Sequence, residues 1–222
     1  MRYFFIALLM MIFTQKEVSA QAIHSVSLEE RNKAIDLTNE AIMHIEDMNT
    51  GRAMEKLQEA IAIDSTHRQA YLQVYQAARA DAGLTETALK ELNKARKIFT
   101  DDDELVFYCA EIHRMKSDFK QAVEEYDLAI KLSKNNGEDF FLVPYYYLNR
   151  GISHLALKLP EKALEDFNYS IKLKPDFSAS ITNRGIVYYQ LGQKEEACKD
   201  WNQARRQNYK PAQEFFEKHC AM

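Results

Sequence analysis

Arginine and aspartate recur as two pairs with the same spacing in the C-terminal third of this 222-residue chain. Asp166 follows Arg150 by 16 residues, and Asp200 follows Arg184 by 16 residues. A half-buried guanidinium is costly unless an acid pairs with it. We therefore predict that the ion pairs Arg150–Asp166 and Arg184–Asp200 each tie two neighbouring helices together. The alternative is that the two arginines bind an anionic ligand.

The three cysteines are the next residues that could do chemistry. An odd number allows at most one internal disulfide and leaves one thiol free. Cys198 lies eleven residues before Tyr209, and Cys220 lies eleven residues after it. If the chain turns near Tyr209, two antiparallel helices bring these cysteines to the same level. We predict a Cys198–Cys220 disulfide, with two free thiols in the core as the alternative, and we expect Cys109 to be a small buried hydrophobe.

No other catalytic or metal-binding pattern is present. The six histidines are scattered, and neither HExxH nor CxxC occurs, which argues against a dedicated zinc site. There is no GxSxG, no GxGxxG after a strand and no phosphate loop. The acidic run at Thr100–Glu104 lacks the glycine and the spaced final glutamate of a calcium loop, so we interpret it as the start of a helix. We predict a protein that is not an enzyme and uses no cofactor or metal.

The composition favours a helical protein. Only 6 glycines and 4 prolines occur among 222 residues, which is too few for a turn-rich all-β fold. The formal net charge is −4, and lysine and arginine do not gather in one segment. A nucleic-acid partner is therefore not expected.

The elements that carry the arginine–aspartate pairs are copies of one another. Arg150 and Ala163 recur 34 residues later as Arg184 and Ala197. Such self-similarity indicates a stacked repeat architecture, and 34 residues is the period of the tetratricopeptide repeat. Weaker copies can be followed upstream, which makes five in all. The chain resembles the tetratricopeptide repeat family over most of the sequence after residue 20.

This resemblance implies an all-α fold, a right-handed α-solenoid of about five helical hairpins with a C-terminal capping helix. A different helical solenoid is the alternative, which the 34-residue spacing disfavours. The five units are expected at 34–68, 69–102, 103–143, 144–177 and 178–210. A lead-in at 21–33 is expected to precede them, and a capping helix at 211–222 to follow them.

The residue sizes within the repeat predict how its helices pack. Four small residues are expected to let the two helices of a hairpin approach closely: Gly151, Ala163, Gly185 and Ala197. The bulky Phe167 and Trp201 are expected to fill the space between one hairpin and the next. A single hairpin cannot bury its apolar face alone, so the stacking of hairpins supplies the core.

Seven extra residues separate the third and fourth copies, within the segment 134–148. Gly137 suits the left-handed position that ends a helix, and Pro144 suits a first helical turn. The segment carries an aromatic cluster made of Phe140, Phe141, Tyr145, Tyr146 and Tyr147. We expect most of these rings to pack against adjacent helices, with a role in lining a binding groove as the alternative.

The first twenty residues read as a secretory signal peptide. Arg2 precedes an apolar run of 11 residues from Tyr3 to Phe13, and small residues lead up to Ala20. A membrane span needs about 20 apolar residues, so no stable span is expected after cleavage behind Ala20. The mature chain is expected to be periplasmic or secreted.

In the tetratricopeptide family the first helices of successive hairpins line a concave groove that binds peptides or partner proteins. By this resemblance, the groove candidates are Phe107, Glu111, Arg114, Leu148, Ile152, Thr182, Ile186 and Tyr189. A mixed and rather apolar surface of this kind suits an extended or helical segment. We expect a non-enzymatic scaffold or adaptor that binds a peptide or protein. The alternatives are an obligate subunit of an envelope-assembly or secretion complex and a regulatory subunit of an enzyme.

Overall fold

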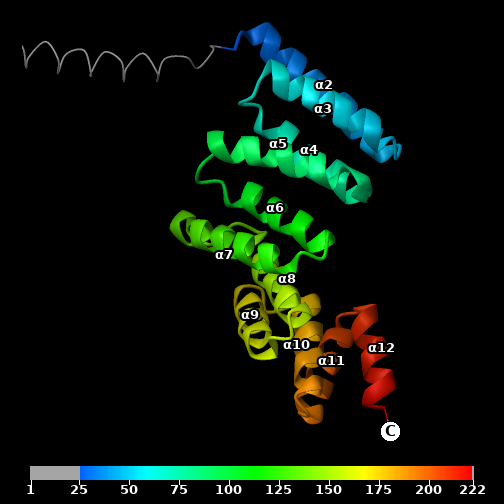
Figure 1. The fold of residues 1–222 in the computed structure, drawn as a ribbon. Helices are drawn as coiled ribbons and strands as arrows, with labels where there is room; N and C mark the ends of the chain where they lie inside the picture. Colours follow the sequence, from blue (N-terminus) through cyan, green and yellow to red (C-terminus); the bar gives the residue numbers. More distant parts are fainter. Residues whose placement is uncertain (1–25, 222) are drawn as a thin grey trace, which may run out of the picture.

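The computed structural model describes residues 26–221, and this part of the chain is all-helical (Figure 1). The predicted signal peptide and its cleavage site lie outside the described residues. The helices form five hairpins: α2 (Leu28–Glu46) with α3 (Thr50–Ile63), α4 (Arg68–Ala80) with α5 (Thr85–Ile98), α6 (Asp103–Met115) with α7 (Phe119–Asn136), α8 (Val143–Ala156) with α9 (Pro160–Leu173), and α10 (Ser178–Gln190) with α11 (Lys194–Arg206). A short 3₁₀ turn, η1 (Ala82–Leu84), precedes α5, and the helix α12 (Lys210–His219) follows the last hairpin.

The hairpins stack in sequence order, so the fold is the predicted all-α solenoid with a C-terminal helix. The second helix of each hairpin contacts the first helix of the next. Consecutive first helices, from α2 to α10, also contact one another, whereas the second helices have at most slight contacts among themselves. The first helices are therefore more closely spaced, and they line the inner side of a curved array.

The array begins earlier than expected. Helix α2 starts at Leu28, whereas the first repeat was expected to begin at residue 34. The reason is a capping box, in which the Ser27 hydroxyl accepts a hydrogen bond from the Glu30 backbone N–H and the Glu30 carboxylate accepts one from the Ser27 N–H. This motif satisfies two orphan backbone donors and starts a helix of 19 residues.

Glycine sets the separation of the two helices in the last two hairpins. A Cβ atom at Gly151 would lie 2.7 Å from Cε1 of Phe167, and one at Gly185 would lie 2.7 Å from Nε1 of Trp201. The bulky residues thus fill the space inside their own hairpins, where glycine leaves room for a ring. We expected Phe167 and Trp201 to fill the space between one hairpin and the next, and this was wrong for their contacts with Gly151 and Gly185. Trp201 also touches α12.

The insertion lies between α7 and α8 and coincides with a change of direction. Gly137 ends α7 with a φ of 106°, and Pro144 lies in the first turn of α8. Beyond this point the helices run at a steep angle to those of the first three hairpins (Figure 1). Tyr146 is fully buried, whereas Phe141 is 70% exposed. Most of the aromatic cluster therefore packs against helices, as expected, and Phe141 does not.

Helix α12 closes the C-terminal end of the array. A disulfide joins Cys198 on α11 to Cys220, directly after α12. The ring of Phe215 stacks on Trp201 at a centroid distance of 5.2 Å. Trp201 is only 1% exposed as a result of its contacts with Gly185 and α12.

The concave face as a candidate binding site

The two arginine–aspartate pairs are present and hold hairpins together. Arg150 Nη2 lies 2.5 Å from Asp166 Oδ1, and Arg184 Nη2 lies 2.7 Å from Asp200 Oδ1. The hydrogen bond to Asp200 raises the pKa of the Arg184 guanidinium above its ordinary value. Arg150 also pairs with Asp127 on α7, at 2.6 Å, which links two hairpins. These guanidinium groups therefore have acid partners within the array.

A third residue shares the first of these pairs. His154 is 7% exposed, and its Nδ1 atom lies 2.8 Å from Asp166 Oδ2. Sequence reasoning did not find this acid partner. The signal that could have found it is the spacing of four residues between Arg150 and His154, which places both side chains on the same face of α8.

Four of the eight groove candidates are buried. They are Phe107 (5% exposed), Glu111 (5%), Leu148 (6%) and Thr182 (2%). Their side chains therefore do not offer a surface to a partner. Neighbouring helices cover these positions. The Phe107 ring, for example, lies 4.6 Å from that of Tyr146 on α8.

Glu111 forms the centre of a buried polar network. Its carboxylate accepts hydrogen bonds from Arg114 Nη2 and Asn149 Nδ2, both at 2.7 Å, and from the Tyr126 hydroxyl. Burial, followed by the charge of Glu111, raises the pKa of Tyr126 well above its ordinary value. The network joins α6, α7 and α8 across the insertion, and it leaves the Glu111 carboxylate committed to protein donors.

The other four candidates remain accessible. Arg114, Ile152 and Ile186 are half-buried, and Tyr189 is 41% exposed. Ile152 and Ile186 occupy the same position in two successive first helices, because they are 34 residues apart.

Leu155 extends this apolar surface, and sequence reasoning did not include it. Leu155 lies one turn beyond Ile152 on α8, just as Tyr189 lies one turn beyond Ile186 on α10. The ring of His219 on α12 borders the surface, 4.5 Å from that of Tyr189. We call the surface formed by Ile152, Leu155, Ile186 and Tyr189 the C-terminal groove.

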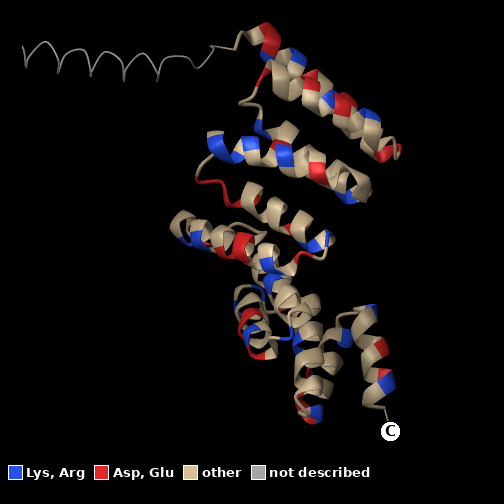
Figure 2. Ribbon diagram, in the orientation of Figure 1, with Lys and Arg blue, Asp and Glu red and all other residues tan. Residues whose placement is uncertain are grey.

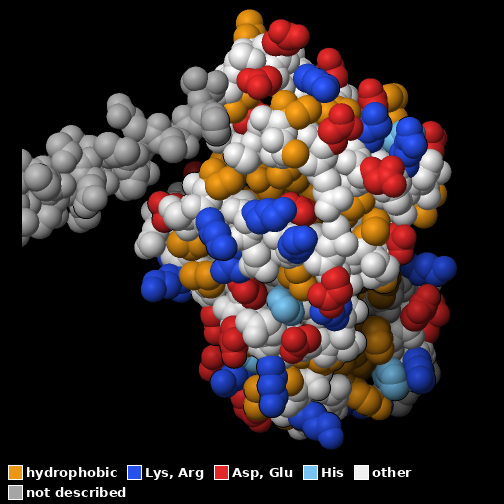
Figure 3. Space-filling view, turned by 45° about the horizontal axis from the view of Figure 1, so that its top comes forward, with side chains coloured by type: hydrophobic (Ala, Val, Ile, Leu, Met, Phe, Trp, Pro, Cys, Tyr) orange, Lys and Arg blue, Asp and Glu red, His pale blue; other side chains and the backbone are white. Residues whose placement is uncertain are grey.

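Apolar side chains on the visible face lie in hollows between helices, whereas charges of both signs cover the ridges (Figures 2 and 3). The C-terminal groove is one apolar strip among the exposed hydrophobic residues of 26–221, which also include Ile98 and Phe141. In residues 26–221 no helix is long and apolar enough to cross a membrane.

A second hollow, of about 620 Å³, lies at the edge of the array, lined by Arg68, Phe99, Asn136, Phe140 and the acidic run 100–104. Arg68 pairs there with Asp102 at 2.5 Å and with Glu104 at 2.7 Å. Asp102 also caps α6 by accepting from the Leu105 N–H, in agreement with the interpretation of the acidic run as a helix start. Arg68, Asp102 and Glu104 are therefore occupied with each other, and Asp103 accepts hydrogen bonds from Asn136 and Tyr146.

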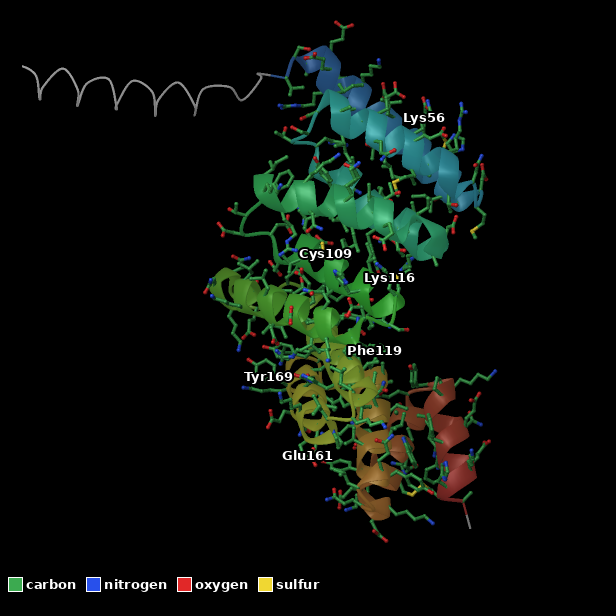
Figure 4. All side chains as sticks on the ribbon, in the orientation of Figure 1. Lys56, Cys109, Lys116, Phe119, Glu161 and Tyr169 are labelled. Carbon is green, nitrogen blue, oxygen red and sulfur yellow. A yellow bond between two sulfur atoms is a disulfide. The ribbon has the colours of Figure 1, made fainter. Side chains whose placement is uncertain are left out.

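The remaining thiol does not offer reactive chemistry. Cys109 lies on α6 between neighbouring hairpins and is 1% exposed (Figure 4). Burial raises the pKa of this thiol to about 12. Since the thiolate is the reactive form, Cys109 is inert at neutral pH. No group of three metal-ligating side chains lies together anywhere in the described part of the chain.

Known proteins share this architecture. No protein-family model matches the chain. The protein CTR9 homolog of Arabidopsis thaliana is 32% identical over 108 residues, which make up 48% of this chain and 9% of that protein. The crystal structure of MamA has a TM-score of 0.64 at 20% identity, over 78% of this chain and 96% of MamA.

The structure of YrrB, described as a TPR protein with an unusual peptide-binding site, has a TM-score of 0.61 at 18% identity, over 86% of this chain and 94% of YrrB. At these identities the solved structures show a shared fold, the tetratricopeptide-type solenoid. The chain spans only a small part of the CTR9 homolog.

Proposed function

We propose that this chain, a tetratricopeptide-type array, is a non-enzymatic scaffold that holds a peptide or a segment of a partner protein in the C-terminal groove. One observation carries the proposal. Ile152 and Leu155 on α8 and Ile186 and Tyr189 on α10 place two equivalent apolar pairs on the inner face, and all four remain accessible. Ile152 and Leu155 pack in part against the core of their hairpin, and the part of all four side chains that stays accessible is apolar surface that a partner can cover.

The shape of the surface supports a segment rather than a small molecule. The groove is a strip across two parallel-running first helices, not an enclosed cavity. Such a strip fits an extended chain or one face of a helix, whose apolar side chains recur at regular spacing. The peptide-binding site ascribed to YrrB, which has the same fold, is consistent with this use.

Crosslinking within the groove tests the proposal. A photo-crosslinking amino acid at Ile186 should trap one partner in the native host cell, and the same amino acid at Ile98, which is exposed on α5 outside the groove, should not. The double variant Ile152→Glu, Ile186→Glu should lose the complex while its circular dichroism and melting temperature stay close to those of the wild type. Equal trapping from Ile186 and Ile98 would contradict the assignment of the groove.

We further propose that the protein acts outside the cytoplasm, in the periplasm or as a secreted protein. The signal-like N-terminus supports this, and so does the disulfide between Cys198 and Cys220, because disulfides persist in oxidising compartments. N-terminal sequencing of the protein from its host would test the idea. A mature chain that begins at Gln21 is expected, and an intact N-terminus in the cytoplasmic fraction would contradict it.

A further inference from the structure

A single row of side chains crosses the inner face of four consecutive hairpins. Its members are the penultimate residues of α4, α6, α8 and α10, namely Arg79, Arg114, Leu155 and Tyr189. These first helices contact one another in sequence, and each of the four residues lies one position before the end of its helix. The row is cationic over two hairpins and apolar over the next two.

The two arginines lie close to a common neighbour. Tyr75 stacks on Tyr108 with a centroid distance of 4.2 Å. Burial and the Glu111 carboxylate raise the pKa of the Tyr75 hydroxyl, while Arg79 and Arg114 both act to lower it. Arg79 lies one turn beyond Tyr75 on α4, and Arg114 lies six residues beyond Tyr108 on α6, so the stacked rings join the two helices that carry the arginines.

The positive charge at this place is only half compensated. Arg114 pairs with Glu111 at 2.7 Å, and its side chain is 30% exposed. Arg79 is exposed, and within residues 26–221 it forms no ion pair. Glu46 is the last residue of α2, the first helix of the preceding hairpin, and it does not pair with Arg79. The row thus offers one free guanidinium, with a second beside it.

Resting on the proposed function, we propose that the partner segment of the C-terminal groove carries an acidic residue that binds Arg79 and Arg114. Packed helices are about 8–10 Å apart, and an extended chain advances about 3.3 Å per residue. One helix step separates Arg114 from Leu155, and two separate Arg79 from it. At least about three residues of extended chain therefore separate the acidic side chain from the apolar residues that occupy the groove, and more are needed where the helices diverge before α8.

The chemistry of the contact explains why an acid is selected. Arginine presents a planar fork of donors that matches a carboxylate, and a bidentate pair is both stronger and more directional than a contact with an amide. The apolar half of the row supplies affinity through burial, whereas the arginine half sets the register and excludes basic segments. The partner is thus an acidic–apolar segment.

Selection from a random twelve-residue peptide display library, with the purified, oxidised chain as bait, tests the inference. Peptides bound by the wild type should be enriched in Asp or Glu at least three residues from two or more apolar residues. The Arg79→Gln bait should select apolar peptides without that enrichment. Arg52→Gln, which changes an exposed cation on α3, is the matched control and should behave as the wild type does.

A synthetic peptide taken from the wild-type selection gives the quantitative test. Replacing its Asp by Asn should weaken binding to the wild type about tenfold and leave binding to Arg79→Gln almost unchanged, and high salt should reduce the difference.

If acidic residues are not enriched, or are enriched equally with the Arg79→Gln bait, the inference is wrong and the groove assignment stands. If the wild-type bait enriches no peptides that the Ile186→Glu bait does not also enrich, the groove assignment fails as well.

Discussion

The Nδ1 atom of His154 lies 2.8 Å from Oδ2 of Asp166, and both side chains are buried. The same carboxylate accepts a hydrogen bond from Arg150, whose side chain is 19% exposed. Asp166 thus joins the first helix of its hairpin at two places. In the next hairpin Asp200 has only Arg184 as its acid–base partner, although the arginine–aspartate spacing is identical.

Asp166→Asn should therefore destabilise the protein more than Asp200→Asn. Removing one member of a buried ion pair costs about 3–5 kcal/mol, and Asp166 loses two partners at once. Urea denaturation gives the free energies of unfolding. Asp176→Asn, at an exposed aspartate without a hydrogen bond or ion pair in the described residues, is the control and should change little. Equal effects at Asp166 and Asp200 would mean that His154 contributes nothing.

Gly151→Ala should destabilise the fourth hairpin. The new Cβ would lie 2.7 Å from Phe167 Cε1 and 3.1 Å from Asp166 Cβ, so the two helices must separate. Overpacking of this kind costs about 1–3 kcal/mol. Gly51→Ala is the matched control, because a Cβ there meets nothing within 4 Å and a helical alanine is favoured by about 0.5–1 kcal/mol. In thermal denaturation, Gly151→Ala should lower the melting temperature of the protein and Gly51→Ala should raise it.

Reduction of the Cys198–Cys220 disulfide should loosen α12. The bridge closes a loop with a sequence separation of 22, and such a cross-link contributes about 3 kcal/mol. Trp201 is the only tryptophan and stacks on Phe215 of α12, so its fluorescence reports on the cap. A red shift is expected with dithiothreitol and in the Cys198→Ser, Cys220→Ser variant. An unshifted spectrum in both would show that packing alone holds the helix.

Cys109 should resist alkylation in the folded protein. Its thiol is buried and has a pKa of about 12, so about one molecule in 10⁴ carries a thiolate at pH 8. Mass spectrometry after iodoacetamide treatment should show an unmodified native chain and one added label in urea without reductant. Fast labelling of the native chain would indicate that the hairpins around α6 open readily.

Much of the architecture follows from spacing along the chain. The 34-residue interval between Arg150 and Arg184 predicted stacked hairpins, and residues three or four apart predicted the packed helix faces. The spacing of Cys198 and Cys220 about Tyr209 likewise led to the pair that the structure joins. These relations are local, since they depend only on helix geometry and on a turn between two adjacent helices.

Relations between hairpins depend on angles that the repeat period does not specify. The insertion before α8 changes the direction of the array, and it brings Asn149 onto Glu111 and the Phe107 ring onto that of Tyr146. Two residues expected in the groove, Phe107 and Glu111, are buried for this reason.

The sequence by itself determined the repeat and the hairpin ion pairs, because a periodic helix assigns each residue to a face, and its resemblance to the tetratricopeptide family supplied the groove candidates Ile152 and Ile186. Only the tertiary structure decided which faces stay open and that Arg79 lies in one row with Leu155. Whether a face is covered depends on how closely the neighbouring hairpin approaches it, and the packing of distant residues sets that distance.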